Sequence, residues 1–399
     1  MNYIKEFFSQ ISSMINDFLN KITDNEIVKK LIIVVFIFFL ILIFILLFAS
    51  CSKKTLSYQK YEEKMISLAK EKYKYNIDSL PKQDKDFITI SLQSFIDNKQ
   101  IKDTQSIIEN HSVCTGYVKI INNNNYYLYL PYLDCGKDYK TPTLFDTLTN
   151  DNNIVTSGNG LYHVNNEYIF KGDIVNNYLQ LNGITYLILR VNNDGTIRVL
   201  DTTKRKMERW DDRFNVEKNA NYGINDYIHN GINSRIKDYI ENLYNDKSEF
   251  KESIKPYFAT TDICIGKRSY YNDNIYDTSI DCSNKISKFP FTLLNVSEYY
   301  EITLDSNCDK YDNNSCENYN YLSSIGSTWT ITADKDTSFK VFKLNNGMFL
   351  SNASYTSYVR IVTTLNGDLV LKKTYDSKTK KYITGDGTEN NPYIVETFN

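Results

Sequence analysis

The chain of 399 residues contains little proline, glycine or histidine and almost no net charge. Six prolines and 15 glycines, beside 42% hydrophobic residues, exclude a collagen-like or a disordered low-complexity chain. Lys and Arg number 46 against 48 Asp and Glu, so the net charge is −2 and no overall positive field attracts nucleic acid. The length suffices for two or three domains with sizeable cores.

The sequence also lacks the common catalytic motifs. HExxH, GxSxG and GxxxxGK[ST] are absent in the strand and helix context that each requires, and no CxxC suggests a zinc site. The three histidines, His111, His163 and His229, have no nucleophile or base beside them that the sequence singles out. We therefore predict no enzyme, no cofactor and no metal. An extracytoplasmic enzyme stays open as an alternative, should His229 meet an acid and a nucleophile in a pocket.

One long apolar run dominates the first fifty residues. Residues 31–49 are all apolar and carry no charge. A helix rises about 1.5 Å per residue, so this run nearly matches a hydrocarbon core of about 30 Å. The run predicts a transmembrane helix over residues 31–50 and a single-pass anchor in the cell membrane. A lipoprotein signal is the alternative, in which Cys51 would carry the lipid.

Beyond Cys51, six cysteines fall into three pairs that are close in sequence. The candidate disulfides are Cys114 with Cys135, Cys264 with Cys282, and Cys308 with Cys316. An even number at short separations suggests an oxidising compartment, although other pairings are open. Three lysines precede the apolar run and five follow it, which weakly favours an amino terminus outside the cell. We expect the amino terminus inside the cell and the bulk of the chain outside it.

Residues 1–30 form a unit of their own. Apolar residues recur every three or four positions from Ile4 to Ile22, which predicts an amphipathic helix over residues 3–22. Its acidic and basic groups balance, so two interpretations stay open. The helix could lie in the membrane interface, or it could form a coiled coil that makes the chain a homo-oligomer.

Residues 55–145 predict a small α+β module. The expected elements are helices at 56–75 and 92–96 and a hairpin of strands 115–121 and 126–133 joined by four asparagines. That hairpin places Cys114 near Cys135 at its open end, where a disulfide would staple the small module.

A polar, turn-rich stretch at 146–160 is the predicted linker to a second domain at 161–399. Asn-Gly and Asn-Asp-Gly turns divide residues 177–201 into a three-stranded meander. An amphipathic helix follows a cap at Ser234. Further Asn-Gly turns separate apolar strands towards the end of the chain, so the domain is expected to be α+β with antiparallel pairing.

An ordered series of short motifs spans residues 155–399 and includes WDDRFN, GINDY, CIGKR, WTIT and GDGTENNPYIV. The series resembles a domain of unknown function in uncharacterised surface proteins of low-GC Gram-positive bacteria. Such domains are distantly similar to the C-type-lectin-like fold of formylglycine-generating enzymes. The resemblance implies that Trp329 and Arg360 lie on strands of the central sheet, although Ile361 replaces the usual proline. The core motif positions are Gly183, Asp194, Gly195, Trp329 and Arg360.

Together these features predict an α+β protein with a transmembrane helix, a helix-plus-hairpin module and a mainly antiparallel C-type-lectin-like domain. We expect a membrane-anchored cell-surface protein whose extracytoplasmic domain binds, or adheres to, a protein or glycan ligand. The alternative is an assembly component of a cell-envelope complex that oligomerises through residues 3–22. Nucleic acid is not an expected partner.

Overall fold

The computed structural model describes residues 55–308, 310–311, 316 and 320–398, together with isolated positions between residues 13 and 39. The chain divides into two compact units, residues 1–56 and 57–399. The predicted helix over residues 3–22 lies mostly outside the described residues, and Cys51 lies outside them entirely. Oligomerisation and lipidation at these places stay predictions.

The predicted fold class needs correction. None of the helices among the described residues has both the length and the apolar character of a membrane span. The transmembrane helix over residues 31–50 is therefore not supported; it was inferred from composition alone, and most of that range lies outside the described residues. The larger unit consists mainly of antiparallel sheets, and its longest helix has 16 residues.

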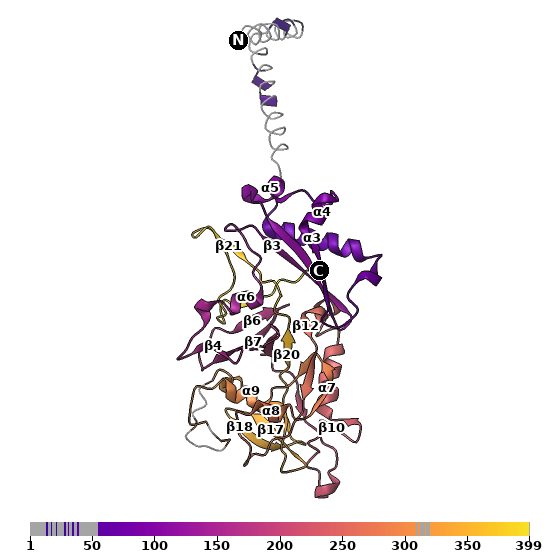
Figure 1. Cartoon of the computed structure of the whole chain (residues 1–399), viewed down its shortest axis with the longest axis vertical. Coiled ribbons are helices and arrows are strands. Elements are labelled where there is room, and N and C mark those ends of the chain that lie inside the picture. The colour runs from indigo at the N-terminus through magenta and orange to yellow at the C-terminus, as the bar shows by residue number, and fades with distance from the viewer. Residues whose placement is uncertain are drawn as a thin grey trace. The chain divides into compact units, whose positions relative to one another are not determined.

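The first part of the larger unit is a three-stranded sheet with helix α3 packed on it (Figure 1). Its elements are α3 (Tyr58–Tyr73), β1 (Phe87–Ser91), α4 (Leu92–Asp97), α5 (Thr104–Ile107), β2 (Thr115–Asn123), β3 (Tyr126–Asp134) and α6 (Leu144–Leu148). The Ser57 hydroxyl accepts from the Lys60 amide and starts α3. Tyr58, Tyr61 and Met65 recur on one face of α3 and are fully buried. Both predicted helices are confirmed.

The predicted hairpin is confirmed, but its turn is shorter than expected. Strands β2 and β3 pair from Thr115 with Asp134 to Asn123 with Tyr126. Only Asn124 and Asn125 form the turn, with φ of 50° and 67°. Asparagine tolerates positive φ, which a primed two-residue turn requires. This register brings Cys114 beside Cys135, and the two form a disulfide with a Cα–Cα distance of 4.1 Å.

A nine-stranded sheet forms the centre of the larger unit. Its strands are β4 (Gly160–Val164), β5 (Glu167–Lys171), β6 (Tyr178–Leu181), β7 (Ile184–Val191), β8 (Ile197–Asp201), β12 (Phe258–Ala259), β15 (Phe291–Thr292), β20 (Val362–Leu365) and β23 (Tyr393–Ile394). The main order is β12-β20-β8-β7-β5-β4. The predicted meander over residues 177–201 is confirmed as β6, β7 and β8, and late strand β20 pairs with β8.

Smaller sheets and helices surround the central sheet (Figure 1). A three-stranded sheet contains β16 (Thr328–Ala333), β17 (Lys340–Leu344) and β18 (Met348–Asn352). The paired short strands are β9 (Met207–Arg209) with β19 (Thr356–Tyr358), β10 (Ile228–His229) with β11 (Ile232–Asn233), β13 (Thr261–Cys264) with β14 (Lys285–Phe289), and β21 (Thr374–Asp376) with β22 (Lys381–Ile383). The remaining helices are α7 (Arg235–Asn245), α8 (Thr278–Asp281) and α9 (Val296–Glu301). Ser234 caps α7 as predicted.

The two residues expected on strands of the central sheet lie elsewhere. Trp329 is on β16 in the three-stranded sheet, where its indole nitrogen donates to the Glu208 carbonyl oxygen at 2.8 Å. Arg360 is buried just before β20, and its guanidinium donates to the carbonyl oxygens of Thr202 and Ile325. Trp329 therefore lies in a different sheet from the expected one, whereas Arg360 lies two residues before β20 of the central sheet and not on the strand itself.

One hydrophobic core runs through the larger unit. It includes Ile121 and Leu128 from the hairpin, Leu144 from α6, and Leu187 and Val199 from the central sheet. The Leu144 amide donates to the Leu369 carbonyl oxygen at 2.8 Å, so α6 is held against the segment that follows β20. The predicted linker at 146–160 lies within this unit; the assignment of separate domains on either side of it stays a prediction.

Candidate functional site

A polar groove of about 640 Å³ lies among loops that are distant in sequence. We call it the Asp226 groove. It is lined by Phe214, Asn215, Val216, Glu217, Lys218, Ile224, Asn225, Asp226, His229, Asn230, Lys267, Lys335, Asp336, Thr337 and Ser338. Three acidic and three basic side chains line it, so the formal charges balance with histidine neutral. Such a groove favours ligands that form directed hydrogen bonds over ligands that carry a large charge of one sign.

Two buried asparagines fix the walls of the groove. The Asn225 side-chain amide donates to the carbonyl oxygens of Asp334, Thr337 and Lys340 at 2.7 to 2.8 Å. The Asn215 amide donates to the carbonyl oxygens of Gly223 and Ser338 at 2.9 and 3.2 Å. Both residues are at most 2% exposed. These bonds tie the 334–340 loop to the opposite wall, so the groove is formed before a ligand arrives.

The floor of the groove carries a hydrogen-bonded chain of charged groups. Asp226 accepts from His229 Nδ1 at 2.6 Å and pairs with Lys267 Nζ at 2.7 Å. Lys267 Nζ also donates to Asn225 Oδ1 at 2.7 Å. Burial alone would raise the pKa of the Asp226 carboxyl, but the hydrogen bonds from Lys267 and His229 and the charge of Lys267 hold that pKa below its ordinary value. Asp226 is therefore a carboxylate at neutral pH.

His229 is oriented by its neighbours. It lies on β10, and the turn to β11 uses Asn230 and Gly231, whose φ values are 51° and 77°. A carboxylate only accepts hydrogen bonds, so the proton of neutral His229 sits on Nδ1. Nε2 then accepts from the Asn230 amide nitrogen, 3.2 Å away. Both ring nitrogens thus contact groove-lining side chains, which fixes the orientation of the imidazole in the groove.

A disulfide and a buried ion pair position Lys267 from behind. Cys264 and Cys282 are bonded, as predicted. Arg268 next to Lys267 is 0% exposed and forms a two-pronged contact with Asp281 at 2.8 and 3.0 Å. The Arg268 amide donates to the Ala333 carbonyl oxygen at 3.0 Å. The backbone that carries Lys267 is thereby attached to β16.

Exposed apolar side chains border the polar floor. Phe214 and Val216 line the groove and are 51% and 81% exposed. Nζ of the groove-lining Lys218 lies 5.4 Å from the Phe339 ring, on which Tyr222 stacks at 5.1 Å. A polar floor with apolar flanks at the rim is typical of surfaces that recognise a ligand.

Catalytic chemistry has less support at this site. The Asp226–His229 pair is the arrangement of an oriented general base. Within the described residues, however, His229 hydrogen bonds only to Asp226 and Asn230, and the nearby Ser338 hydroxyl accepts from Asn215 at 3.1 Å. A nucleophilic mechanism would need a nucleophile within hydrogen-bond reach of His229. The described residues place none there.

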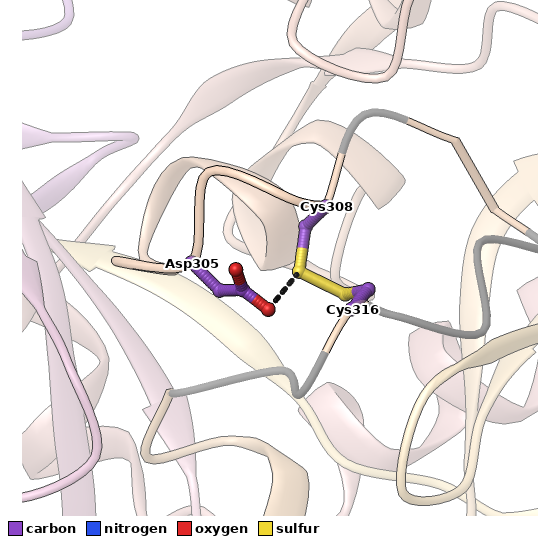
Figure 2. A group of neighbouring side chains, drawn as sticks. All are labelled: Asp305, Cys308 and Cys316. Carbon is purple, nitrogen blue, oxygen red and sulfur yellow. Dashed lines mark hydrogen bonds between the residues drawn. A yellow bond between two sulfur atoms is a disulfide. The ribbon is translucent and has the colours of Figure 1, made fainter.

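The other predicted cysteines form a disulfide rather than a metal site. Figure 2 shows Cys308 bonded to Cys316, with Asp305 beside them. The Asp305 carboxylate is 3.6 Å from Cys308 Sγ. These are the only three neighbouring side chains of the described residues whose ligand atoms cluster closely enough for an ion. Both sulfurs are already bonded to each other, and zinc requires thiolates, so this group is not a zinc centre.

The motif positions on turns have structural roles outside the Asp226 groove. Gly183 takes a φ of 82° in the turn between β6 and β7, and Gly195 takes 77° between β7 and β8. Asp194 accepts from the Thr196 amide at 3.1 Å and pairs with Lys85 at 3.5 Å. These residues hold the meander and attach it to the segment before β1.

Sequence reasoning missed most of the Asp226 groove. His229 was singled out, but Asn225, Asp226 and Lys267 were not. A signal was nevertheless present, because the GINDY motif contains Asn225 and Asp226 while CIGKR contains Lys267. The structure brings these two motifs into direct contact, with Lys267 Nζ 2.7 Å from both an Asn225 and an Asp226 oxygen.

No protein family, curated protein or solved structure matches the chain. The resemblance to surface-protein domains of low-GC Gram-positive bacteria therefore stays a prediction, and the functional argument depends on the residues of the Asp226 groove.

Proposed function

We propose that this chain is an extracytoplasmic binding protein of the cell surface and that the Asp226 groove holds its ligand. The observation that carries the proposal is a preformed polar groove with exposed Phe214 and Val216 at its rim. The oriented Asp226, His229 and Lys267 side chains offer both donors and acceptors. Hydroxyl groups of a glycan and backbone groups of a protein loop both suit such a floor.

The extracytoplasmic location is supported by the three disulfides. Disulfides persist in oxidising compartments and are rare in the reducing cytosol. All six cysteines beyond Cys51 are paired within the chain, over separations of 8 to 21 residues. A binding or adhesion role at the cell surface is compatible with these disulfides.

The location has a direct test in intact cells that produce the full chain. A membrane-impermeant thiol reagent should label the six paired cysteines only after the cells are treated with a reductant, because disulfide sulfurs are not nucleophilic. A variant in which these six cysteines are serine is the control and should take up no label beyond that at Cys51. Free thiols that react only after cell lysis would contradict the proposed location.

The binding role has a test on the purified full chain. The chain should retain a ligand from an array of cell-envelope glycans and secreted proteins. The Phe214→Ser/His229→Gln variant should then bind that ligand at least about tenfold more weakly, which corresponds to about 1.4 kcal/mol. Tyr75→Ser is the matched control, because Tyr75 is 86% exposed and does not line the groove. Equal losses in both variants would exclude the groove as the binding site.

A further inference from the structure

A sealed cluster outside the Asp226 groove joins α3 to a segment near the end of the chain. Glu62 lies on α3, and Lys373 lies just before β21. Lys373 Nζ is 2.9 Å from Glu62 Oε2, although the two residues are 311 positions apart. The side chains are 3% and 1% exposed. An amine and a carboxyl are thus held in contact at a place that bulk water hardly reaches.

Hydroxyl groups and aromatic rings complete the enclosure. Glu62 Oε1 accepts from the Tyr139 hydroxyl at 2.7 Å and from the Thr141 hydroxyl. The Tyr139 hydroxyl also contacts Lys373 Nζ. The Tyr58 ring stacks on Tyr139 at 4.3 Å, and Tyr382 meets both rings edge-on. Tyr139 therefore touches both the amine and the carboxyl and can pass a proton between them.

Burial makes the neutral amine of Lys373 and the protonated carboxyl of Glu62 more accessible than they would be in water. In water, ordinary pKa values of 10.5 for lysine and 4.5 for glutamate strongly favour the ion pair over a free amine and a carboxylic acid. Desolvation by burial raises the pKa of Glu62 and lowers the pKa of Lys373, despite their attraction for each other. A buried ion pair gains little over neutral groups, because the desolvation of two charges offsets the attraction.

From this contact we propose that Glu62 and Lys373 are joined by an intramolecular isopeptide bond. The lone pair of neutral Lys373 Nζ attacks Glu62 Cδ, and a C–N bond forms. The Cδ–OH bond breaks, and the hydroxyl leaves as water with a proton that Nζ gives up through Tyr139. The reaction is a condensation, so it needs no oxidant, reductant or cofactor.

The surroundings favour both formation and persistence of the bond. Holding two reacting groups in contact replaces a bimolecular encounter with an intramolecular step, which lowers the entropic part of the barrier. Exclusion of water disfavours hydrolysis of the product. A third carboxyl, Glu396, acts electrostatically on both partners, and its buried Oε2 has no hydrogen-bond partner among the described residues.

The bond would differ from the three disulfides in the length of chain that it closes. The disulfides link residues 8, 18 and 21 positions apart, whereas Glu62 and Lys373 are 311 positions apart. A link over a longer loop removes more freedom from the unfolded chain. It would also survive reduction, which opens every disulfide. The helix-plus-hairpin module would stay attached to the C-terminal segment even in a reducing solvent.

Mass spectrometry of the reduced, denatured full chain tests the bond. We expect the main species to be lighter than the sequence by one water molecule, and a protease digest to yield one branched species that contains Glu62 and Lys373. A main species at the full sequence mass, with separate peptides for the two residues, would overturn the proposal. This outcome is decided on the wild-type chain, whether or not any variant folds.

Two comparisons make the assignment specific. The Lys373→Arg variant keeps a positive charge but lacks a nucleophilic amine, so it should show the full mass and separate peptides. The Asp226–Lys267 pair is an internal control, because its atoms are 2.7 Å apart but its side chains are 34% and 35% exposed. Its peptides should stay separate. Loss of one water in the Lys373→Arg variant would place the bond elsewhere and contradict the assignment.

Discussion

Replacing Arg268 with methionine should lower the free energy of unfolding by about 3–5 kcal/mol, because it leaves the buried Asp281 charge without its partner. Arg268 is 0% exposed and Asp281 is 1% exposed. The guanidinium also donates to the carbonyl oxygens of Asn274 and Asp277. Methionine keeps the volume of the stem and supplies none of these donors. Chemical denaturation of the full chain with its disulfides intact measures the loss.

Matched variants separate the ion pair from a general packing effect. Arg235 makes a similar two-pronged contact with Asp212, but these side chains are 50% and 28% exposed, so Arg235→Met should cost under about 1 kcal/mol. The Arg268→Met/Asp281→Leu double variant should recover part of the loss, because it removes the unpaired charge. An Arg268→Met variant within about 1 kcal/mol of the wild type would contradict the prediction.

The same substitution should weaken ligand binding. The Arg268 amide and carbonyl groups bond to the backbone of Ala333 and Lys335. Lys267 and Lys335, on either side of this attachment, both line the Asp226 groove. A shift of the Arg268 backbone therefore moves two groove side chains at once. If the groove binds the proposed ligand, stability and ligand recognition would be coupled through one short segment, the part of the chain between β13 and α8.

Local elements could be predicted because their signals are local. The meander over residues 177–201 follows from alternating apolar residues and from Asn182-Gly183, which takes the positive φ values that a primed turn requires. The hairpin pairing placed Cys114 near Cys135 even though the turn was taken as four residues. Asparagines 122 and 123 belong to the strand because cross-strand pairing outweighs their weak preference for strands.

Long-range pairings could not be predicted in the same way. Strand β20 lies between β8 and the short strands β12 and β15, and β23 pairs with β6 in parallel. Several of these strands have only two residues, too few for any period to indicate a partner. Trp329 was misplaced for a different reason: its position was taken from the family resemblance, whereas β16 pairs with its neighbour β17 in a separate three-stranded sheet.

The Asp226 groove illustrates a different limit. Its polar residues come from loops, where no hydrophobic period marks which side chains converge. Asn225 is 1% exposed, yet in the sequence it resembles the many surface asparagines of this chain. Only the three-dimensional contact between the GINDY and CIGKR motifs distinguishes it. The buried Glu62–Lys373 pair was missed for the same reason, because 311 residues separate its members.

A second large effect is expected from pH, at two glutamates of helix α9. Glu298 contacts Arg198 and Arg190 at 2.7 and 3.2 Å, and Glu301 contacts Arg190 at 3.0 Å. Burial raises the pKa of Glu301 to about 7, because the Arg190 charge is shared with the Glu298 and Glu167 carboxylates. Burial also opposes ionisation of Glu298, but the charges of Arg198 and Arg190 hold its pKa below the ordinary value.

These opposite shifts predict opposite pH dependences. The raised pKa of Glu301 contributes about 3 kcal/mol to the free energy of unfolding below about pH 4.5. This contribution is lost as the pH rises to about 7. Glu301→Gln mimics the protonated form, so it should match the wild type in acid and exceed its stability above pH 7. Ionised Glu298 stabilises the fold above its ordinary pKa of 4.5, and that contribution falls in acid.

The two glutamine variants provide controls for each other. Glu298→Gln should be less stable than the wild type above pH 4.5, because Arg198 then lacks the ionised partner that it has in the wild type. The difference should shrink as the pH falls, because Glu298 of the wild type becomes protonated as well. Denaturant unfolding of both variants and the wild type from pH 4 to 8 gives the two difference curves. If both variants were more stable, or both less stable, than the wild type at neutral pH, the predicted opposite pKa shifts of Glu298 and Glu301 would be contradicted. Curves of opposite sign would establish that one helix carries both an acid-favouring and an acid-sensitive contact to β7 and β8. The combined contribution of the two glutamates to stability would then be greatest near pH 4.5.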